Sequence, residues 1–264
     1  EMCIRDRCGR NSAQWSIAAL ACLTYGAVAV PILHDFKSDN IHHLVTHSDA
    51  KLFFVDEAIW ENLDAESMPG IAGALLIADY SLLFSRNSRL TDARAHLNEL
   101  FGHRWPDRFT ADDVKYPVFS HDTMALINYT SGSTGFSKGV MLTYGNLWSN
   151  IQYSIDGLTF LKPGDGMVCM LPLAHMYGLV FEMLHTFVKG CHIYFLTRTP
   201  SPKVIMDAFA TVRPKLIITV PLIIEKIIRT RVFPMLEKPL MKLLMHIPLV
   251  DDHLLAKIKE KLDE

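Results

Sequence analysis

Asn128-Tyr-Thr-Ser-Gly-Ser-Thr-Gly-Phe-Ser-Lys-Gly139 combines glycines, hydroxyls and a lysine directly after the apolar run that begins at Met124. Glycines tolerate positive φ and allow successive backbone amides to turn inward as a nest for an anion. An ordinary polar hairpin is the alternative for such a stretch. Donor side chains for phosphate oxygens are Thr130, Ser131, Ser133, Thr134 and Lys138. The stretch therefore predicts a phosphate-binding loop.

Two other loop motifs overlap this stretch. The Walker pattern fails, because Ser137 replaces its second glycine and Gly139 replaces its magnesium-binding hydroxyl. The loop also satisfies G-x-S-x-G, which would make Ser137 the nucleophile of a serine hydrolase at a strand that turns directly into a helix. Here residues 140–143 predict a second strand, and the next helix starts only after its N-cap, Thr143. A phosphate loop between two strands is favoured, and the hydrolase stays open as an alternative.

Three segments resemble the adenylate-forming (AMP-binding) enzymes, which include acyl-CoA synthetases, luciferases and peptide-synthetase adenylation domains. Residues 129–140 are similar to the family signature, and residues 171–178, Leu-Pro-Leu-Ala-His-Met-Tyr-Gly, are similar to its proline-leucine-x-histidine segment beside the acyl site. Residues 26–31 are similar to its glycine-alanine-valine-proline strand. The resemblance extends from about Gly9 to the end of the chain and is strongest to bacterial long-chain fatty acid acyl-CoA synthetases.

The resemblance implies ATP, Mg²⁺ and coenzyme A as the cofactor and co-substrates of a two-step acid–thiol ligase. Lys138 and His175 would be catalytic, and Thr130 would also touch the metal ion. His175 and Tyr177 would contact the carboxylic acid. Apart from the resemblance, the apolar residues Met176, Tyr177, Phe181 and Met183 suggest an apolar substrate channel, and ordinary core packing is the alternative. Nucleotide contacts would come from Thr130, Ser131, Gly132, Ser133, Thr134, Gly135 and Lys138.

Two departures from the family pattern are Ser137, where proline is usual, and Tyr144, where histidine is common. Neither removes a phosphate donor, so we expect them to change loop stiffness more than chemistry. The family's later tyrosine-glycine-x-threonine-glutamate segment, ribose-binding aspartate, hinge and C-terminal lysine are not found in this chain. The chain is therefore expected to be an N-terminal fragment, inactive or nearly so alone. A non-catalytic nucleotide-binding module is the remaining alternative.

Alternating helix and strand patterns predict an α/β fold with mostly parallel sheets covered by helices. Ser12 is the expected cap of a first helix that Gly26 ends, and Ser38 the expected cap of a second. Helices are also predicted over 175–188 and 202–211. Beyond the loop, strands are predicted over residues 27–30, 51–56, 73–77, 166–170, 191–195 and 215–220.

The domain prediction is one partial AMP-binding domain over residues 1–264. Residues 9–120 would form a first sheet subdomain, and residues 121–264 the phosphate loop and a second sheet subdomain. Residues 85–113 are expected to form a polar surface excursion. Residues 1–7 fit no helix or strand pattern, and the sequence leaves open whether they are native.

Composition limits the partners. The 264 residues are 50% hydrophobic and 20% charged, enough for a sizeable core, and the formal net charge of −2 gives no basis for binding nucleic acid. We therefore expect small-molecule partners. The five cysteines include no C-x-x-C pair, which favours a reducing, cytoplasmic setting. Peripheral membrane contact stays open, without a motif that supports it, and the oligomeric state is not encoded in any recognisable pattern.

Overall fold

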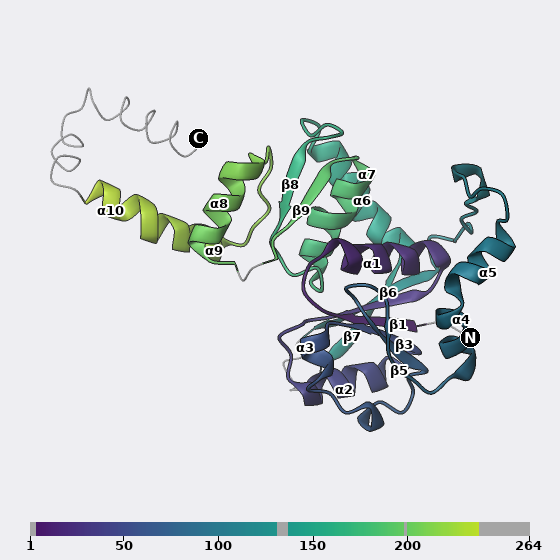
Figure 1. Cartoon of the computed structure of the whole chain (residues 1–264). Coiled ribbons are helices and arrows are strands. Elements are labelled where there is room, and N and C mark those ends of the chain that lie inside the picture. Colours follow the sequence, from purple (N-terminus) through teal and green to yellow (C-terminus); the bar gives the residue numbers. More distant parts are fainter. Residues whose placement is uncertain (1–3, 131–136, 198–199, 238–264) are drawn as a thin grey trace.

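The computed structural model describes residues 4–130, 137–197 and 200–237. Within these residues the strands form one sheet of seven strands and one of two. Figure 1 shows α1 (Ala13–Tyr25) and α2 (Ser38–His47) on opposite faces of the larger sheet, with the smaller sheet beyond α1. The predicted α/β class is confirmed.

The larger sheet has the strand order β5-β4-β3-β1-β2-β6-β7. Neighbouring strands are parallel except for the two outermost pairs, β4 with β5 and β6 with β7. Helical connections between consecutive parallel strands produce this arrangement. The strands are β1 (Ile4–Cys8), β2 (Val28–Ile32), β3 (Leu52–Val55), β4 (Gly73–Leu76), β5 (Leu82–Ser85), β6 (Met124–Thr130) and β7 (Lys138–Thr143).

β1 lies between β2 and β3 at the centre of the sheet. The expectation that residues 1–7 would form no element was wrong for the residues described, since Ile4–Cys8 is a strand. Its alternation is hard to recognise because Asp6 and Arg7 are charged, yet both side chains are buried. The backbone hydrogen bonds to β2 and β3 therefore outweigh the low strand preference of these charged residues.

Opposite faces of the large sheet pack in two cores. Val28 and Val30 of β2 face α2 and pack with Ile41 and Leu44, whereas Ala29 faces α1. This alternation follows from the two-residue period of a strand. The core on the α1 side continues into Cys169, Leu173 and Val180, and so joins the large sheet to the second sheet and its helices.

The first helix has the predicted termini. Ser12 accepts a hydrogen bond from the Trp15 amide, and Gly26 ends α1 in the left-handed region with φ 82°. The second helix differs in one detail, because α2 begins at Ser38 itself and the capping position is Lys37, without a side-chain hydrogen bond.

Residues 85–113 form the expected excursion. The two helices within it, α4 and α5, have no buried residue. Figure 1 shows α5 projecting away from both sheets. The short helices of the first half are α3 (Glu57–Trp60), η1 (Ala65–Ser67), α4 (Ser88–Ala95), α5 (Leu97–Arg104) and η2 (Ala111–Asp113).

The second sheet pairs β8 (Gly166–Cys169) in parallel with β9 (His192–Phe195). The helix predicted over 175–188 is present from Met176 onward, but its central part is a π-helix, Gly178–Leu184. Thr143 caps α6 as expected, by accepting from the Asn146 amide. The other helices are α6 (Tyr144–Gly157), α7 (His185–Val188), α8 (Pro202–Val212), α9 (Pro221–Ile227), the π-helix η4 (Ile228–Val232) and α10 (Phe233–Leu236).

The strand predicted over residues 215–220 is not formed. Leu216 and Ile218 still pack into a core with Met167 of β8, but this segment has no ladder with either strand of the smaller sheet. Its apolar run therefore reflects side-chain burial, which a loop also satisfies. A run of apolar residues does not by itself form the backbone hydrogen bonds of a sheet.

The predicted domain division at residue 120 stays a prediction. The strands on both sides of the phosphate loop, β6 and β7, belong to the large sheet, because Ala29 of β2 pairs with Leu126 of β6. The first sheet thus includes residues beyond 120. The phosphate loop is consequently attached to the larger sheet, with only β8 and β9 in the smaller one.

Gly26 offers a test of the α1 terminus. A Cβ at this residue would lie 2.5 Å from the Phe119 ring, in a left-handed conformation that side chains disfavour. We expect Gly26→Ala to lower the free energy of unfolding by at least ~1–2 kcal/mol, measured by urea denaturation. Gly157→Ala is the matched control, because Gly157 also ends a helix but has no atom within 4 Å of the added methyl. Equal effects of the two substitutions would contradict this account of Gly26.

Candidate functional site

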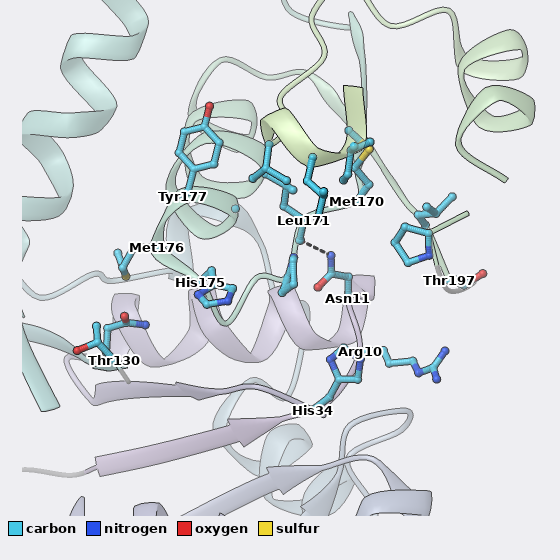
Figure 2. Close-up of a pocket in the computed structure, with 18 of the residues that line it drawn as sticks. Arg10, Asn11, His34, Thr130, Met170, Leu171, His175, Met176, Tyr177 and Thr197 are labelled. Atoms are coloured by element: carbon cyan, nitrogen blue, oxygen red, sulfur yellow. Dashed lines mark hydrogen bonds between the residues drawn. The ribbon is translucent and has the colours of Figure 1, made fainter. Parts of the chain in front are cut away.

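A cavity of about 910 Å³ lies where the β6–β7 hairpin meets the carboxyl end of β8 and the helix that follows it. Ligand sites in α/β proteins commonly lie at the carboxyl ends of strands. Figure 2 shows the cavity with Thr130, His175 and Tyr177 among its labelled residues. It is lined by Arg10, Asn11, His34, Asn128, Thr130, Val140, Leu142, Met170, Leu171, Pro172, His175, Met176, Tyr177, Gly178, Leu196, Thr197, Pro200, Val220, Leu222 and Ile223.

The register of the hairpin determines which of its side chains face the cavity. Asn128 pairs with Val140, and Thr130 pairs with Lys138. Paired residues share a face, and residues two apart on a strand share it too. Asn128, Thr130 and Val140 line the cavity, so Lys138 extends from the same face, at the end of the hairpin nearest the phosphate loop.

The predicted nucleotide-binding residues divide into two groups. Thr130 and Lys138 are described and are both exposed at the end of the hairpin, although Lys138 itself is not among the cavity-lining residues. Ser131, Gly132, Ser133, Thr134 and Gly135 lie outside the described residues.

His175 lies in the turn between β8 and the helix that starts at Met176. Its backbone amide donates to the Pro172 carbonyl at 3.0 Å, and its side chain is exposed to the cavity. In the view of Figure 2, His175 lies between Thr130 of the hairpin and Asn11. The structure thus brings together Thr130, His175 and Tyr177, which the sequence places in two separate motifs.

Two asparagines hold the segment that carries His175. The buried amide of Asn128 donates to the Ala174 carbonyl at 3.1 Å. Asn11 donates to the Leu171 carbonyl at 2.7 Å and accepts from the Leu173 amide at 3.0 Å. The backbone before His175 is therefore tied to β6 and to the loop between β1 and α1.

Glu182 holds the beginning of the same segment. Its Oε2 accepts from the backbone amides of Met170 and Leu171 at 3.1 and 2.9 Å, and the residue is 0% exposed. Burial raises the pKa of Glu182 to about 8, an effect that these amides and the thiol of Cys169 partly oppose. Glu182 belongs to the π-helix Gly178–Leu184, and π-helical turns often occur at functional sites.

The proposed apolar channel is only partly formed by the residues expected. Met176 and Tyr177 line the cavity, and Tyr177 is 49% exposed. The ring of Phe181 packs against that of Tyr177, with centroids 5.2 Å apart. Met183 is fully buried in the core on the α1 side, so its place in the channel prediction was wrong. Apolar lining comes instead from residues such as Leu196 and Leu222.

The opposite face of the hairpin is anchored to α2. Tyr129 Oη lies 2.7 Å from His47 Nδ1, and burial raises the pKa of Tyr129 to about 12. His42 accepts from the Asp64 amide through Nε2. In the described part of the chain, no group of three or more His, Cys, Asp or Glu side chains could hold a metal ion.

Tyr144, the second departure from the family pattern, has a packing role. Its hydroxyl donates to the Leu23 carbonyl at 2.5 Å, and its ring stacks on Phe119 with centroids 4.9 Å apart. This contact joins α6 to the end of α1. Tyr144 does not line the cavity, so its side chain does not contribute to the cavity-facing side of the hairpin.

The hydrolase alternative does not fit the structure. Ser137 directly precedes β7, Lys138–Thr143, whereas a nucleophile elbow requires the serine to lead into a helix. The first helix after Ser137 is α6, which begins at Tyr144. The two strands predicted on either side of the loop are confirmed as β6 and β7, and the phosphate-binding role of the loop stays a prediction.

Asn11, Asn128 and Glu182 were not assigned roles from the sequence. Two of them carried a signal, because each interrupts an apolar run: Asn128 in β6, and Glu182 within the π-helix Gly178–Leu184. A polar residue at such a position is usually buried with hydrogen-bond partners. The partners themselves are distant in sequence and could not be inferred.

The fold and the cavity define an α/β domain with a pocket where the β6–β7 hairpin meets the carboxyl end of β8. A sequence profile of the AMP-binding enzyme family matches residues 8–259, and the chain belongs to this family. The resemblance drawn from the three sequence segments is therefore confirmed.

Curated relatives are fatty acid ligases. The chain is 30% identical over 224 residues to long chain acyl-CoA synthetase 6, peroxisomal, of Arabidopsis thaliana, covering 82% of this chain and 30% of that protein. It is 25% identical to long-chain-fatty-acid–CoA ligase 5 of Rattus norvegicus, covering 91% of this chain and 35% of that protein. The chain thus spans about a third of the length of these relatives.

Solved structures support the fold. The ATP-bound crystal structure of MatB from Rhodopseudomonas palustris superposes with a TM-score of 0.66 at 22% identity, covering 87% of this chain and 41% of that chain. The inhibitor-bound N-terminal domain of FACL13 from Mycobacterium tuberculosis gives a TM-score of 0.65 at 16% identity, covering 90% and 55%.

Among the described residues, no helix has the length and apolar character needed to cross a membrane. The described cysteines, Cys8, Cys22, Cys169 and Cys191, are free and buried. The cytoplasmic setting stays a prediction.

The raised pKa of Glu182 predicts a pH-dependent stability. The folded protein keeps this proton at pH values where the unfolded chain has lost it, so the contribution is complete below pH 4.5 and is lost as the pH rises through about 8. We expect Glu182→Gln to lose less unfolding free energy than the wild type across this window, measured by urea denaturation at several pH values. Parallel curves for the two proteins would show that Glu182 is not the titrating group.

Proposed function

We propose that the protein to which this chain belongs activates a carboxylic acid with ATP and transfers the acyl group to coenzyme A. In the first step a carboxylate oxygen bonds to the α-phosphorus of ATP, and the bond to pyrophosphate breaks. In the second step the coenzyme A thiol bonds to the acyl carbon, and AMP leaves. The proposal rests on family membership together with one arrangement: the loop-bearing hairpin end, Thr130 and Lys138, adjoins the cavity that also holds His175.

The hairpin end suits the phosphates. Lys138 supplies a positive charge and Thr130 a hydroxyl at the two paired ends of β6 and β7. Donors fixed before the reaction stabilise charge that develops on leaving pyrophosphate. In this role Lys138 is a catalytic residue of the adenylation step.

Thr130 fits a single contact to Mg²⁺. A hydroxyl oxygen suits this hard cation, which typically takes its remaining ligands from water, substrate phosphates and one or two carboxylates. Thr130 is exposed at the end of β6, and the described residues hold no cluster of acidic or histidine ligands beside it. When bound with ATP, Mg²⁺ would neutralise phosphate charge, and Thr130 would orient it without forming a complete site.

The other part of the cavity suits the acid. His175 is placed to contact the carboxylate or to gate the nucleotide, and Tyr177 lies two residues further on at the apolar wall. Leu171, Leu196 and Leu222 contribute to a lining that accommodates an aliphatic chain. We therefore propose a fatty acid as substrate, which also agrees with the curated relatives.

The reaction needs residues that this chain does not contain. We propose that a downstream glutamate, a ribose-binding aspartate and a C-terminal lysine complete the enzyme, and that the chain alone is inactive or nearly so. The partners are ATP, the acid and coenzyme A. Pyrophosphate release that requires both ATP and a fatty acid, measured on the full-length protein, tests the proposal. ATP binding without turnover by that protein would favour a non-catalytic nucleotide-binding module.

Lys138→Ala tests the phosphate end. Loss of one fixed donor from the transition state costs on the order of 3 kcal/mol, so adenylation in the full-length protein should slow about a hundredfold. The measurement is acid-dependent exchange of labelled pyrophosphate into ATP. Lys203→Ala, which removes an exposed lysine of α8, is the control and should leave the rate unchanged. An unaltered exchange rate in Lys138→Ala would refute the role of Lys138.

Tyr177→Ala tests the acid end. Removal of a half-exposed ring from the cavity wall enlarges the space for an acyl chain, so the preferred chain length should increase. The measurement is kcat/KM for a series of saturated fatty acids of increasing length. Tyr153→Ala, at an exposed tyrosine of α6 that does not line the cavity, should keep the wild-type profile. Identical profiles for Tyr177→Ala and wild type would remove Tyr177 from the acyl site.

A further inference from the structure

The backbone of the cavity wall at the end of β8 is hydrogen-bonded to the buried carboxyl group of Glu182. β8 pairs with β9 only as far as Cys169, so the amides of Met170 and Leu171 lie beyond the last pair of the ladder. Both amides donate to Oε2 of Glu182. A single carboxylate oxygen can accept both bonds, because each oxygen has two lone pairs.

The same two residues form part of the cavity. Met170 and Leu171 line it, and Pro172 continues the wall toward His175. The next carbonyl along, that of Leu171, is already held by Asn11, and the carbonyl of Ala174 by Asn128. Glu182 therefore fixes the start of a segment whose later peptide groups are fixed by other elements.

Stability alone is a weak reason to place a carboxylate here. Burial of an ionisable group is costly, and apolar side chains often replace buried charges without loss of stability. The neighbouring side chains of the same helix, Leu179, Val180 and Met183, are apolar and buried. An acceptor at this one position is needed because of the two amides, and the amides belong to the cavity wall.

We propose that Glu182 is a positioning residue for the acid substrate, which holds the Met170–Leu171 backbone so that the apolar wall and the His175 turn keep their places. The inference rests on the proposed function, since it concerns the same cavity. Glu182 does not line the cavity and touches no substrate itself. Its effect is transmitted by the two backbone amides.

Substitution of Glu182 by glutamine or by leucine separates the effect of its hydrogen bonds from the effect of its side-chain volume. In Glu182→Gln the amide oxygen can still accept both backbone bonds, and its NH₂ group takes the place of Oε1, which accepts neither of them. In Glu182→Leu the side chain fills similar space but leaves both amides without an acceptor. Glutamine should therefore rescue the position of the wall, and leucine should not.

The experiment compares these variants in the full-length protein. KM for the fatty acid should rise about tenfold in Glu182→Leu, as expected when a buried hydrogen-bonded contact is lost, and should stay within twofold of wild type in Glu182→Gln. KM for ATP should change less than KM for the fatty acid in either variant, because the hydrogen bonds of Glu182 go to Met170 and Leu171 and not to β6 or β7. Binding of the fatty acid to each variant, followed by calorimetry, gives a second measurement that does not require turnover.

His185→Leu is the matched control. His185 is also polar and fully buried on the same helical run, but it does not line the cavity or bond to its wall. This substitution should change the free energy of unfolding without changing KM for the fatty acid. If Glu182→Leu, like His185→Leu, leaves KM for the fatty acid unchanged, Glu182 has only a structural role. If KM rises as much in Glu182→Gln as in Glu182→Leu, the two hydrogen bonds from the backbone amides are not the cause.

Failure of the proposed function gives a different result. A wild-type protein that releases no pyrophosphate with ATP and any fatty acid refutes the ligase proposal before any variant is compared. A wild type that turns over normally, with an unchanged KM and unchanged fatty acid affinity in Glu182→Leu, refutes the positioning role alone.

Discussion

The hydrogen bond from the Asn128 amide to the Ala174 carbonyl joins the phosphate hairpin to the segment that carries His175. This buried contact joins the large sheet to the segment that follows β8. Asn128 itself and His175, the residue after Ala174, line the same cavity. Buried polar groups that satisfy each other specify one relative position, because any displacement leaves both without partners. The geometry of the cavity depends on this link and on the parallel link made by Asn11.

The two strands that flank the predicted phosphate loop are anchored to the rest of the large sheet and to α2. β6 joins the large sheet by pairing with β2, and the Tyr129 hydroxyl forms a hydrogen bond with His47 of α2. The pairing of Thr130 with Lys138 then brings two donor side chains to the end of the ladder. Such an arrangement places donors before a ligand arrives, which is the condition for electrostatic stabilisation of a transition state.

Polar side chains that are buried or partly buried have two different roles in this chain: some hold the backbone of the cavity wall, and others join helices away from the cavity. Glu182 and Asn128 bond to backbone groups that carry cavity-lining residues. Tyr144 bonds to the end of α1 and stays outside the cavity, so the departure from the family pattern at this position changes the contact between two helices. The physical difference lies in which backbone segment each side chain is hydrogen-bonded to.

Local patterns in the sequence were enough to predict the strands on either side of residues 131–136, the termini of α1 and the α/β class, because caps, turns and apolar periods act over a few residues. They failed at β1, which contains buried charged residues and pairs with a strand on each side, and at residues 215–220, where an apolar run packs into a core without joining a sheet. Tertiary structure alone decided that Thr130 and His175 share a cavity and that Glu182 supports its wall. Hydrogen bonds between distant peptide groups make those choices, and no local pattern records their partners.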